Sequence, residues 1–196
     1  MRKNYFSNTL KMLLTIVFSC VFMSVWAQSE IHVEKAGTLP SLLPTSENTL
    51  KITGSINGTD VKHLRKLISE GSVNSLDLSG VRIVKGGSAY DGTNKTEDDI
   101  IGPTMFKNFT NLRSVELPAT ITAIRSQAFA ATGLKKVDIP NTVSTLEDHV
   151  FADCSFLNTV VIGRRVSRMH QGVFYNSPVK TAFVKPETPP ITSPYY

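Results

Sequence analysis

The stretch that decides the fold is Leu112-Arg-Ser-Val-Glu-Leu-Pro118, followed by Ile124-Arg-Ser-Gln-Ala-Phe129 and by a second copy that starts with Leu134-Lys-Lys-Val-Asp-Ile-Pro140. Within Leu-x-x-Val-x-Leu the apolar residues alternate with polar ones, which predicts a short strand with one buried face. The stretch from the second Ile to the Phe predicts a turn of α-helix or 3₁₀-helix on the opposite side. One such unit cannot bury its apolar side alone, so we expect stacked copies that share a continuous core.

The unit recurs every 22 to 23 residues through the second half of the chain. Its marker is a phenylalanine that follows a small or apolar residue, and it occurs at Phe106, Phe129, Phe151 and Phe174. The central strand position is filled by Val115, Val137, Val160 and Ala182, and the last one by Leu117, Ile139, Ile162 and Val184. This agreement across several apolar columns predicts a solenoid whose strands pair in parallel along one face.

The repeat resembles that of the BspA-like, or treponemal-type, leucine-rich repeat family of exported bacterial proteins. The resemblance covers about 101–184. It is carried by the two units quoted above and by Val150-Phe-Ala-Asp-Cys-Ser-Phe-Leu157. Residues 36–43 and 52–60 also look like the leaders of such proteins in Bacteroides-type bacteria. The resemblance implies an α/β repeat fold, a right-handed leucine-rich-repeat solenoid with parallel strands on one face and an N-terminal cap with a short helix. It also implies a secreted or cell-surface location, with host extracellular-matrix or cell-surface proteins as partners.

The first 27 residues are interpreted as a signal peptide for export. A polar and basic stretch precedes the apolar run 12–27, and Val25-Trp26-Ala27 has modest side chains at the positions that signal peptidase reads. Two alternatives stay open. One is an uncleaved anchor helix, for which the run is short, and the other is a lipidated Cys20. The membrane is expected as a partner only through this segment.

The net charge of the rest of the chain is small. The sequence has 21 Lys+Arg and 16 Asp+Glu, a formal net charge of +5. Arg2, Lys3 and Lys11 lie in the expected signal, which contains no acidic residue, so 18 basic and 16 acidic residues remain and the charge falls to +2. Such a weak field argues against nucleic acid as a partner. The cysteine count of two excludes a disulfide framework and a four-cysteine zinc site.

The chain is expected to divide into four segments. They are a signal peptide at 1–27, an N-terminal cap region at 28–72, leucine-rich repeats at 73–184 with a polar, glycine-rich insertion at 85–100, and a Pro-rich tail at 185–196. In the cap region we expect a strand at 50–53, a turn at Asn57-Gly58, and a helix over 61–68 that Asp60 caps. The tail does not continue the repeat pattern.

The reactive side chains form no catalytic pattern. The four histidines, His32, His63, His149 and His170, include no His-Glu-x-x-His and no close pair. In the repeat register, Arg125, Glu147 and His170 each lie four residues before a Phe, which predicts an exposed ladder of alternating charge. Cys154 shares a column with small or apolar residues, which predicts a buried and unreactive thiol.

The insertion contains oxygen-bearing side chains that could be imagined as calcium ligands. They are Asp91, Asn94, Glu97, Asp98 and Asp99. Their spacing does not match an EF-hand loop, and a solvated loop is the simpler interpretation. We therefore expect no metal site, no cofactor and no catalytic residue.

The informative surface is the outward side of the strands. The residues on either side of the central Val point to solvent, which defines one column of Ser75, Ser114, Lys136, Thr159 and Thr181 and another of Asp77, Glu116, Asp138, Val161 and Phe183. The second column passes from acidic to apolar, which predicts a protein-docking stripe. The expected contact residues are Asp77, Ser114, Glu116, Lys136, Asp138, Thr159, Val161 and Phe183. The alternative is that a C-terminal cap, or the tail, covers Val161 and Phe183.

The function predicted from the sequence is therefore protein binding. We expect an exported leucine-rich repeat protein, not an enzyme, that binds another protein through its strand face. The alternative is the structural N-terminal fragment of a longer surface protein whose function lies elsewhere. A secreted hydrolase is the third hypothesis, and it requires reactive side chains to meet in one cleft.

Overall fold

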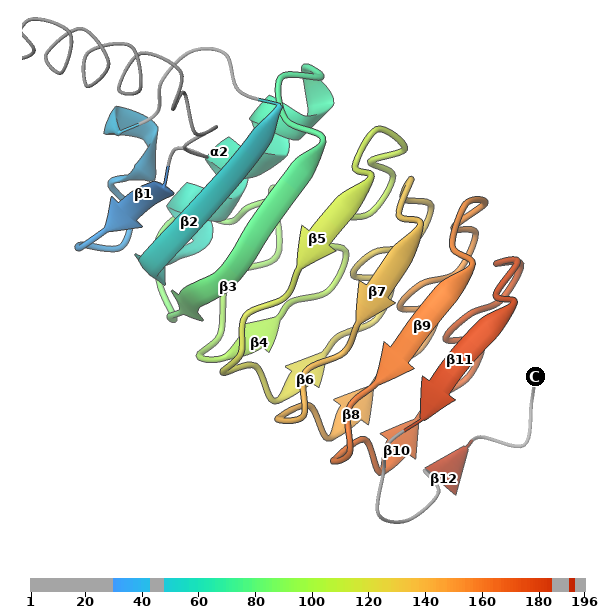
Figure 1. Cartoon of the computed structure of the whole chain (residues 1–196). Helices are drawn as coiled ribbons and strands as arrows, with labels where there is room; N and C mark the ends of the chain where they lie inside the picture. Colours follow the sequence, from blue (N-terminus) through green and yellow to red (C-terminus); the bar gives the residue numbers. More distant parts are fainter. Residues whose placement is uncertain (1–29, 43–47, 185–190, 193–196) are drawn as a thin grey trace, which may run out of the picture.

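The computed structural model describes residues 30–42, 48–184 and 191–192, and Figure 1 shows the coils stacked side by side in sequence order. The first row of strands consists of β1 (Glu30–Val33), β2 (Thr49–Ile56), β3 (Ser75–Ile83), β5 (Ser114–Glu116), β7 (Lys136–Asp138), β9 (Thr159–Ile162) and β11 (Thr181–Val184). The second row consists of β4 (Ile100–Ile101), β6 (Ala123–Ile124), β8 (Thr145–Leu146), β10 (Arg168–Met169) and β12 (Ile191–Thr192). Neighbouring strands within each sheet pair in parallel, so the predicted parallel-strand solenoid is confirmed.

The second side of each coil differs from the prediction. Where a turn of helix was expected, each coil has a two-residue strand followed by tight turns. Alternate backbone amides around Phe129 donate to the next coil, Gln127 N to Asp148 O and Phe129 N to Val150 O, both at 2.9 Å, while Ala128 and Ala130 close single turns within the coil. Hydrogen bonds between coils therefore alternate with single-turn bonds, and no continuous helix forms.

Left-handed backbone conformations explain why these turns do not become helical. In the coil of Phe129, the residues two before and two after it, Gln127 and Ala131, have φ of 57° and 56°. The same two positions have positive φ in every coil from Phe106 to Phe174. A residue in this conformation cannot continue a right-handed helix.

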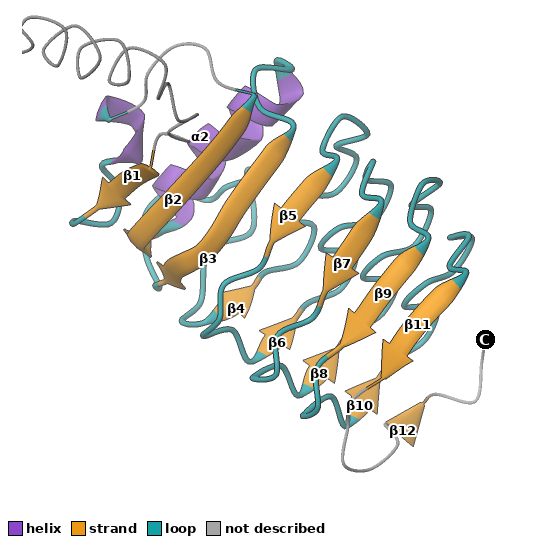
Figure 2. Cartoon of the chain, viewed as in Figure 1, coloured by secondary structure: helices purple, strands orange, loops and turns teal. Residues whose placement is uncertain are grey.

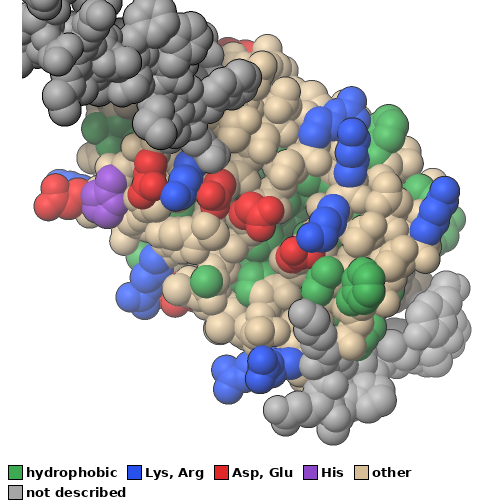
Figure 3. Space-filling view, in the orientation of Figure 1, with side chains coloured by type: hydrophobic (Ala, Val, Ile, Leu, Met, Phe, Trp, Pro, Cys, Tyr) green, Lys and Arg blue, Asp and Glu red, His purple; other side chains and the backbone are tan. Residues whose placement is uncertain are grey.

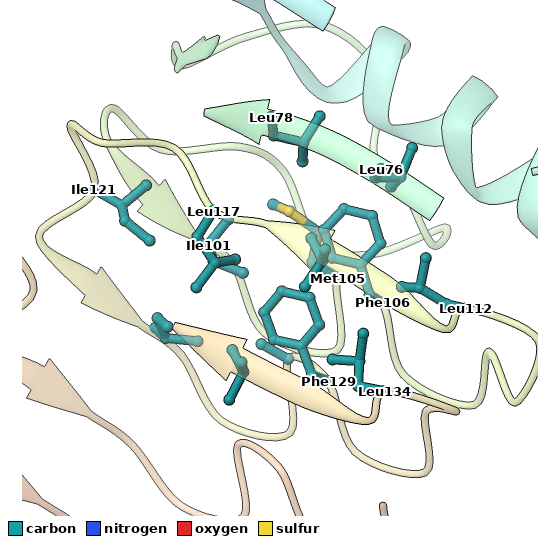
Figure 4. Close-up of a cluster of buried hydrophobic side chains, with 14 of the residues drawn as sticks. Leu76, Leu78, Ile101, Met105, Phe106, Leu112, Leu117, Ile121, Phe129 and Leu134 are labelled. Atoms are coloured by element: carbon teal, nitrogen blue, oxygen red, sulfur yellow. The ribbon is translucent and has the colours of Figure 1, made fainter. Parts of the chain in front are cut away.

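The core is a ladder of stacked rings beneath the strands. The ring centroids of Phe106, Phe129, Phe151 and Phe174 lie 5.2, 5.4 and 5.7 Å apart in sequence order, with interplanar angles of 15°, 9° and 8°. Figure 4 shows Phe106 and Phe129 packed among aliphatic side chains, including Leu112 and Leu134, which lie two residues before β5 and β7. The column predicted from the sequence is thus the axis of the core.

The N-terminal part joins the same stack. Strand β2 pairs with β3 and β1 pairs with β2, while helix α2 (Gly58–Ser69) lies behind β2 and β3, next to the 3₁₀-helix η1 (Leu39–Ser41) (Figure 2). No helix in the described part of the chain is long and apolar enough to cross a membrane. The expected signal peptide lies outside the described residues.

The start of α2 corrects the sequence prediction. The strand runs to Ile56 and leads directly into the helix, so Asn57-Gly58 is not a turn; Asn57 is the N-cap and its side chain accepts from Thr59 N at 2.9 Å. Asp60 lies at the third helical position and completes a capping box. Its buried carboxylate also accepts from the backbone N–H of Leu39 at 2.9 Å, which joins the helix to the segment before it.

The insertion is more ordered than a solvated loop. Tyr90 is buried and its hydroxyl donates to Pro103 O at 2.8 Å. The buried hydroxyl of Thr96 donates to Val84 O at 2.8 Å, and Gly86 pairs with Thr96 across the base of the loop. Two buried side chains in an otherwise polar segment fix the insertion to the solenoid.

Candidate functional site: the strand face

The strand face is the outward side of β3, β5, β7, β9 and β11, defined by the eight contact residues predicted above. Within each sheet the pairing register matches the predicted columns, whereas β5 and β7 end two different sheets and are joined by no strand pairing; Glu116 and Asp138 of these two strands line one hollow. Asp77 lies opposite Glu116, Asp138 opposite Val161, and Val161 opposite Phe183. In the neighbouring column Ser75 lies opposite Ser114, and Thr159 lies between Lys136 and Thr181. The structure therefore brings the eight residues together on one surface.

The acidic half of the strand face carries three carboxylates and one ammonium group. Glu116 and Asp138 are exposed, and Lys136 lies 2.9 Å from Asp138. The hydrogen bond and the charge of Asp138 raise the pKa of Lys136 above its ordinary value. Asp77 accepts from the backbone N–H and the hydroxyl of Ser79 at 2.9 and 2.6 Å, which directs this carboxylate toward the end of its own strand.

The apolar half follows at the C-terminal coils. Figure 3 shows red atoms over the middle strands of this face, with green atoms grouped toward β9 and β11. Phe183 is 55 % exposed and Val161 is half-buried. The alternative was that a C-terminal cap or the tail covers them. Most of the tail lies outside the described residues, and its described part, β12, pairs with β10 in the second row of strands.

The strand face continues further toward the N-terminus than the sequence analysis placed it. Lys51 of β2 lies opposite Asp77, and Glu30 of β1 lies opposite Lys51 and forms an ion pair with it at 2.8 Å. The alternation of Leu50-Lys51-Ile52 was a signal for this strand, but sequence alone did not show that it joins the same sheet. The column therefore alternates in charge at its start and becomes acidic from Asp77 onward.

The charge ladder on the second side is only partly as predicted. Arg125 bonds Glu147 at 2.6 Å and also reaches Glu97 of the insertion at 3.4 Å. Burial raises the pKa of Glu147, but hydrogen bonds from Arg125 and Ser126 outweigh it and leave this pKa below its ordinary value. His170 follows Glu147 in the strand register as predicted, but its ring nitrogen lies 3.9 Å from Asp148. Arg125, Glu147 and His170 are half-buried and not exposed as predicted, and the Arg125–Glu147 pair joins neighbouring coils.

Cys154 is a core residue. It is fully buried and free, and its sulfur donates to Phe129 O at 3.2 Å and lies 3.2 Å from the hydroxyl of Thr132. Burial raises the pKa of the thiol. The predicted buried position is confirmed, and a raised pKa disfavours the reactive thiolate.

The acidic residues of the insertion bind separate protein groups. Asp91 accepts from Asn94 and Thr104, Asp98 from the backbone of Lys85, and Asp99 from Thr120. Within residues 30–42, 48–184 and 191–192, no three His, Cys, Asp or Glu side chains come together as a metal site would require. The four acidic residues of this set act as local hydrogen-bond or ion-pair partners.

The stacked coils, the parallel rows of strands and the ring ladder define a leucine-rich repeat solenoid. Residues 94–193, just over half of the chain, match the family described as BspA type leucine rich repeat region, with six copies of the repeat. The chain belongs to this family, as its sequence predicted. Proteins built on such solenoids are generally scaffolds for protein interaction and not enzymes.

A similar solved structure is the crystal structure of a leucine-rich repeat protein from Bacteroides ovatus ATCC 8483. The likeness has a TM-score of 0.38 at 16 % sequence identity and covers 78 % of this chain and 45 % of that chain. This chain thus spans less than half the length of that protein. Comparison with the curated proteins found no match.

Proposed function

We propose that this protein is an exported scaffold that binds another protein through the strand face. The observation that carries the proposal is the surface itself, in which exposed carboxylates on β5 and β7 continue into Val161 and the exposed Phe183. A face built on paired strands is preformed, so little conformational entropy is lost when a partner docks. The partner class that fits an exported family member is a host extracellular-matrix or cell-surface protein.

The finer features of the fold belong to the same proposal. A right-handed solenoid is supported by the general rule that parallel strands joined by a crossover are right-handed in about 98 % of cases. The role of residues 28–72 as a cap is supported by α2 and η1, which lie at the first coils (Figure 2). Export rests on the sequence of residues 1–27, and the repeat boundaries at 73–184 rest on the repeat pattern.

Charge reversal on the strand face tests the binding function. The purified chain and its Glu116→Lys, Asp138→Lys variant are compared for capture of matrix and cell-surface proteins. A matched control, Lys62→Glu, Lys66→Glu, changes two charges on the outward side of α2, away from the strand face. Loss of capture only in the strand-face variant supports the proposal. Equal capture by the wild type and this variant would show that the strand face is not the binding surface.

Export is tested by fractionation of cells that express the tagged chain. A processed protein that starts near Gln28, found outside the cytoplasm, is the expected result. Retention of the full-length chain in the cytoplasm would contradict it.

The second candidate function, a structural fragment of a longer surface protein, is favoured by one observation. At the last coil Val184 is 51 % exposed, whereas its equivalent one coil earlier, Ile162, is 4 % exposed. The inner side of β11 therefore exposes apolar surface that a further coil or a cap would bury. Sequencing beyond the codon for Tyr196 decides whether the reading frame continues.

A further inference from the structure

The strand face contains a hollow where β5, β7 and β9 end. Its volume is about 440 Å³. The exposed or half-buried lining includes Glu116, Asp138 and Val161, and the buried lining includes Leu117, Ile139 and Ile162. Gly163, also in the lining, has no room for a side chain because a Cβ there would collide with the carbonyl of Pro140. No side chain therefore projects from Gly163 at the end of β9, and the hollow is not filled from this position.

The charges around the hollow select a cation. Glu116 and Asp138 both line it, while Lys136 is the cation of the same strands and is already paired with Asp138 at 2.9 Å. A carboxylate binds most strongly to a cation that donates two parallel hydrogen bonds in one plane. A guanidinium group has this geometry, whereas an ammonium group does not. The charge of the hollow is thus complementary to an arginine side chain.

The apolar lining fits the stem of the same side chain. Arginine and lysine place their methylene groups along apolar surface while the charged end stays at the polar rim. Here Val161 and Leu117 supply the apolar surface next to the carboxylates. An arginine satisfies both parts of the hollow, whereas a small inorganic cation would leave the apolar part unfilled.

The distance to the next apolar contact fixes a spacing in the partner. The hollow spans β5, β7 and β9 and is therefore centred on β7, while the exposed Phe183 lies two strands further on β11. Neighbouring strands are about 4.8 Å apart, so the two contacts are separated by about 10 Å. A partner segment in the polyproline II conformation rises about 3.1 Å per residue and has three residues per turn, so residues three positions apart lie on the same side of the segment and about 9 Å apart, close to this separation.

We propose that the strand face binds a protein segment in the polyproline II conformation, with an arginine and a large apolar residue three positions apart. The arginine enters the hollow beside Glu116 and Asp138, and the apolar residue packs on Phe183. This inference rests on the proposed function and states the partner's chemistry for that surface.

The probe is an octapeptide, acetylated and amidated, with the sequence Ser-Ala-Arg-Ser-Ala-Leu-Ser-Ala, and a second one with Arg and Leu exchanged covers the opposite chain direction. Binding to the full chain is followed by amide shifts in NMR titration at low salt. The matched control carries citrulline, a neutral isostere, in place of arginine. A further control places Arg and Leu next to each other. We expect at least one arginine peptide to bind tenfold tighter than both controls, with shifts at Glu116, Asp138 and Phe183.

Two variants give effects of opposite sign. Glu116→Gln with Asp138→Asn should abolish the preference for arginine over citrulline. Lys136→Met should strengthen binding of the arginine peptide several-fold, because it removes the cation that competes for Asp138. All three positions are exposed, and an unchanged unfolding midpoint verifies that each variant folds.

Equal affinity for arginine and citrulline peptides, absence of shifts with any peptide, or weaker binding by Lys136→Met would overturn the inference. The capture experiment separates this result from failure of the proposed function. If charge reversal abolishes capture but no peptide preference exists, the strand face binds a protein by other chemistry. If charge reversal leaves capture unchanged, both proposals fail.

Discussion

At the scale of single residues, the phenylalanine ladder carries much of the stability of the solenoid. Phe129 is fully buried between the rings of Phe106 and Phe151. Its ring contributes both buried apolar area and stacking on two sides. The periodic Phe in the sequence is therefore an energetic requirement of the coil and not only a marker of its length.

Replacing Phe129 with alanine should destabilise the protein by about 3–5 kcal/mol, the usual cost of removing a large buried ring. Urea denaturation followed by circular dichroism measures the change. The control is Phe183→Ala, at an exposed ring, which should change the unfolding free energy by less than about 0.5 kcal/mol. A similar small loss for both variants would contradict the role of the ladder.

The left-handed positions are the second residue-scale feature. The equivalents of Ala131 two residues after the other Phe rings are Asn108, Asp153 and Asn176, types that tolerate positive φ, whereas alanine does not. Ala131→Gly should therefore stabilise the protein by about 0.5–1 kcal/mol, because relief of strain exceeds the added freedom of the unfolded chain.

The control is the neighbouring Ala130→Gly, at a buried alanine without positive φ, which should destabilise by about 1 kcal/mol. Thermal unfolding of both variants measures whether each change in stability has the expected sign. Destabilisation of similar size at both positions would show that position 131 carries no strain.

At the scale of elements, one carboxylate of the insertion, that of Asp91, accepts several hydrogen bonds. Burial raises the pKa of Asp91, but hydrogen bonds from Thr104, Asn94 and Thr93 outweigh this effect and lower the pKa to about 2. A carboxylate with a lowered pKa stabilises the folded state above its unfolded pKa of about 4. This contribution is lost as the pH falls from about 4 to about 2.

Asp91→Asn should therefore lower the unfolding free energy at pH 6, and the difference from wild type should shrink as the pH falls toward 2. Urea unfolding at several pH values between 6 and 2 measures this difference. Glu70→Gln, at an exposed residue of the helix end, serves as the control and should follow the wild-type pH profile closely. A difference that stays constant down to pH 2 would contradict the lowered pKa.

At the scale of the whole molecule, each coil contacts its neighbours along the stack, and among the described strands β1 and β11 each pair on one side only. Stability in such a molecule is approximately a sum over coils and the interfaces between them. The residues of β11 are all exposed, in contrast to the buried centres of β7 and β9.

Hydrogen–deuterium exchange should therefore show a gradient along the stack. Amides of β7 and β9 should exchange most slowly, and those of β11 fastest, because the last coil can open without breaking the others. Exchange measured by mass spectrometry on overlapping peptides tests this expectation. Uniform protection from β5 to β11 would indicate one cooperative unit.

Much of the solenoid was predictable because its information is periodic. The columns of Phe, Val and Leu in the sequence predict which residues face the core. Stacking coils of equal length then places equivalent residues side by side, which sets the strand register. The two-residue strands and turns before each Phe were not predicted, since their backbone amides bond to the next coil. Helix α2 was predicted to start too late, because the capping box uses Asn57 and Asp60 together and Asp60 alone resembles a cap.

The sequence by itself determined the repeat, the family, the ring ladder and the membership of the two outward columns, because each depends on spacing along the chain. Only the tertiary structure decided which charges pair, that Lys51 and Glu30 extend the column, that the insertion is anchored by Tyr90, and that a hollow lies between Glu116 and Asp138. These features depend on side-chain contacts or on the shape of the space between side chains, and neither is set by the period of the repeat.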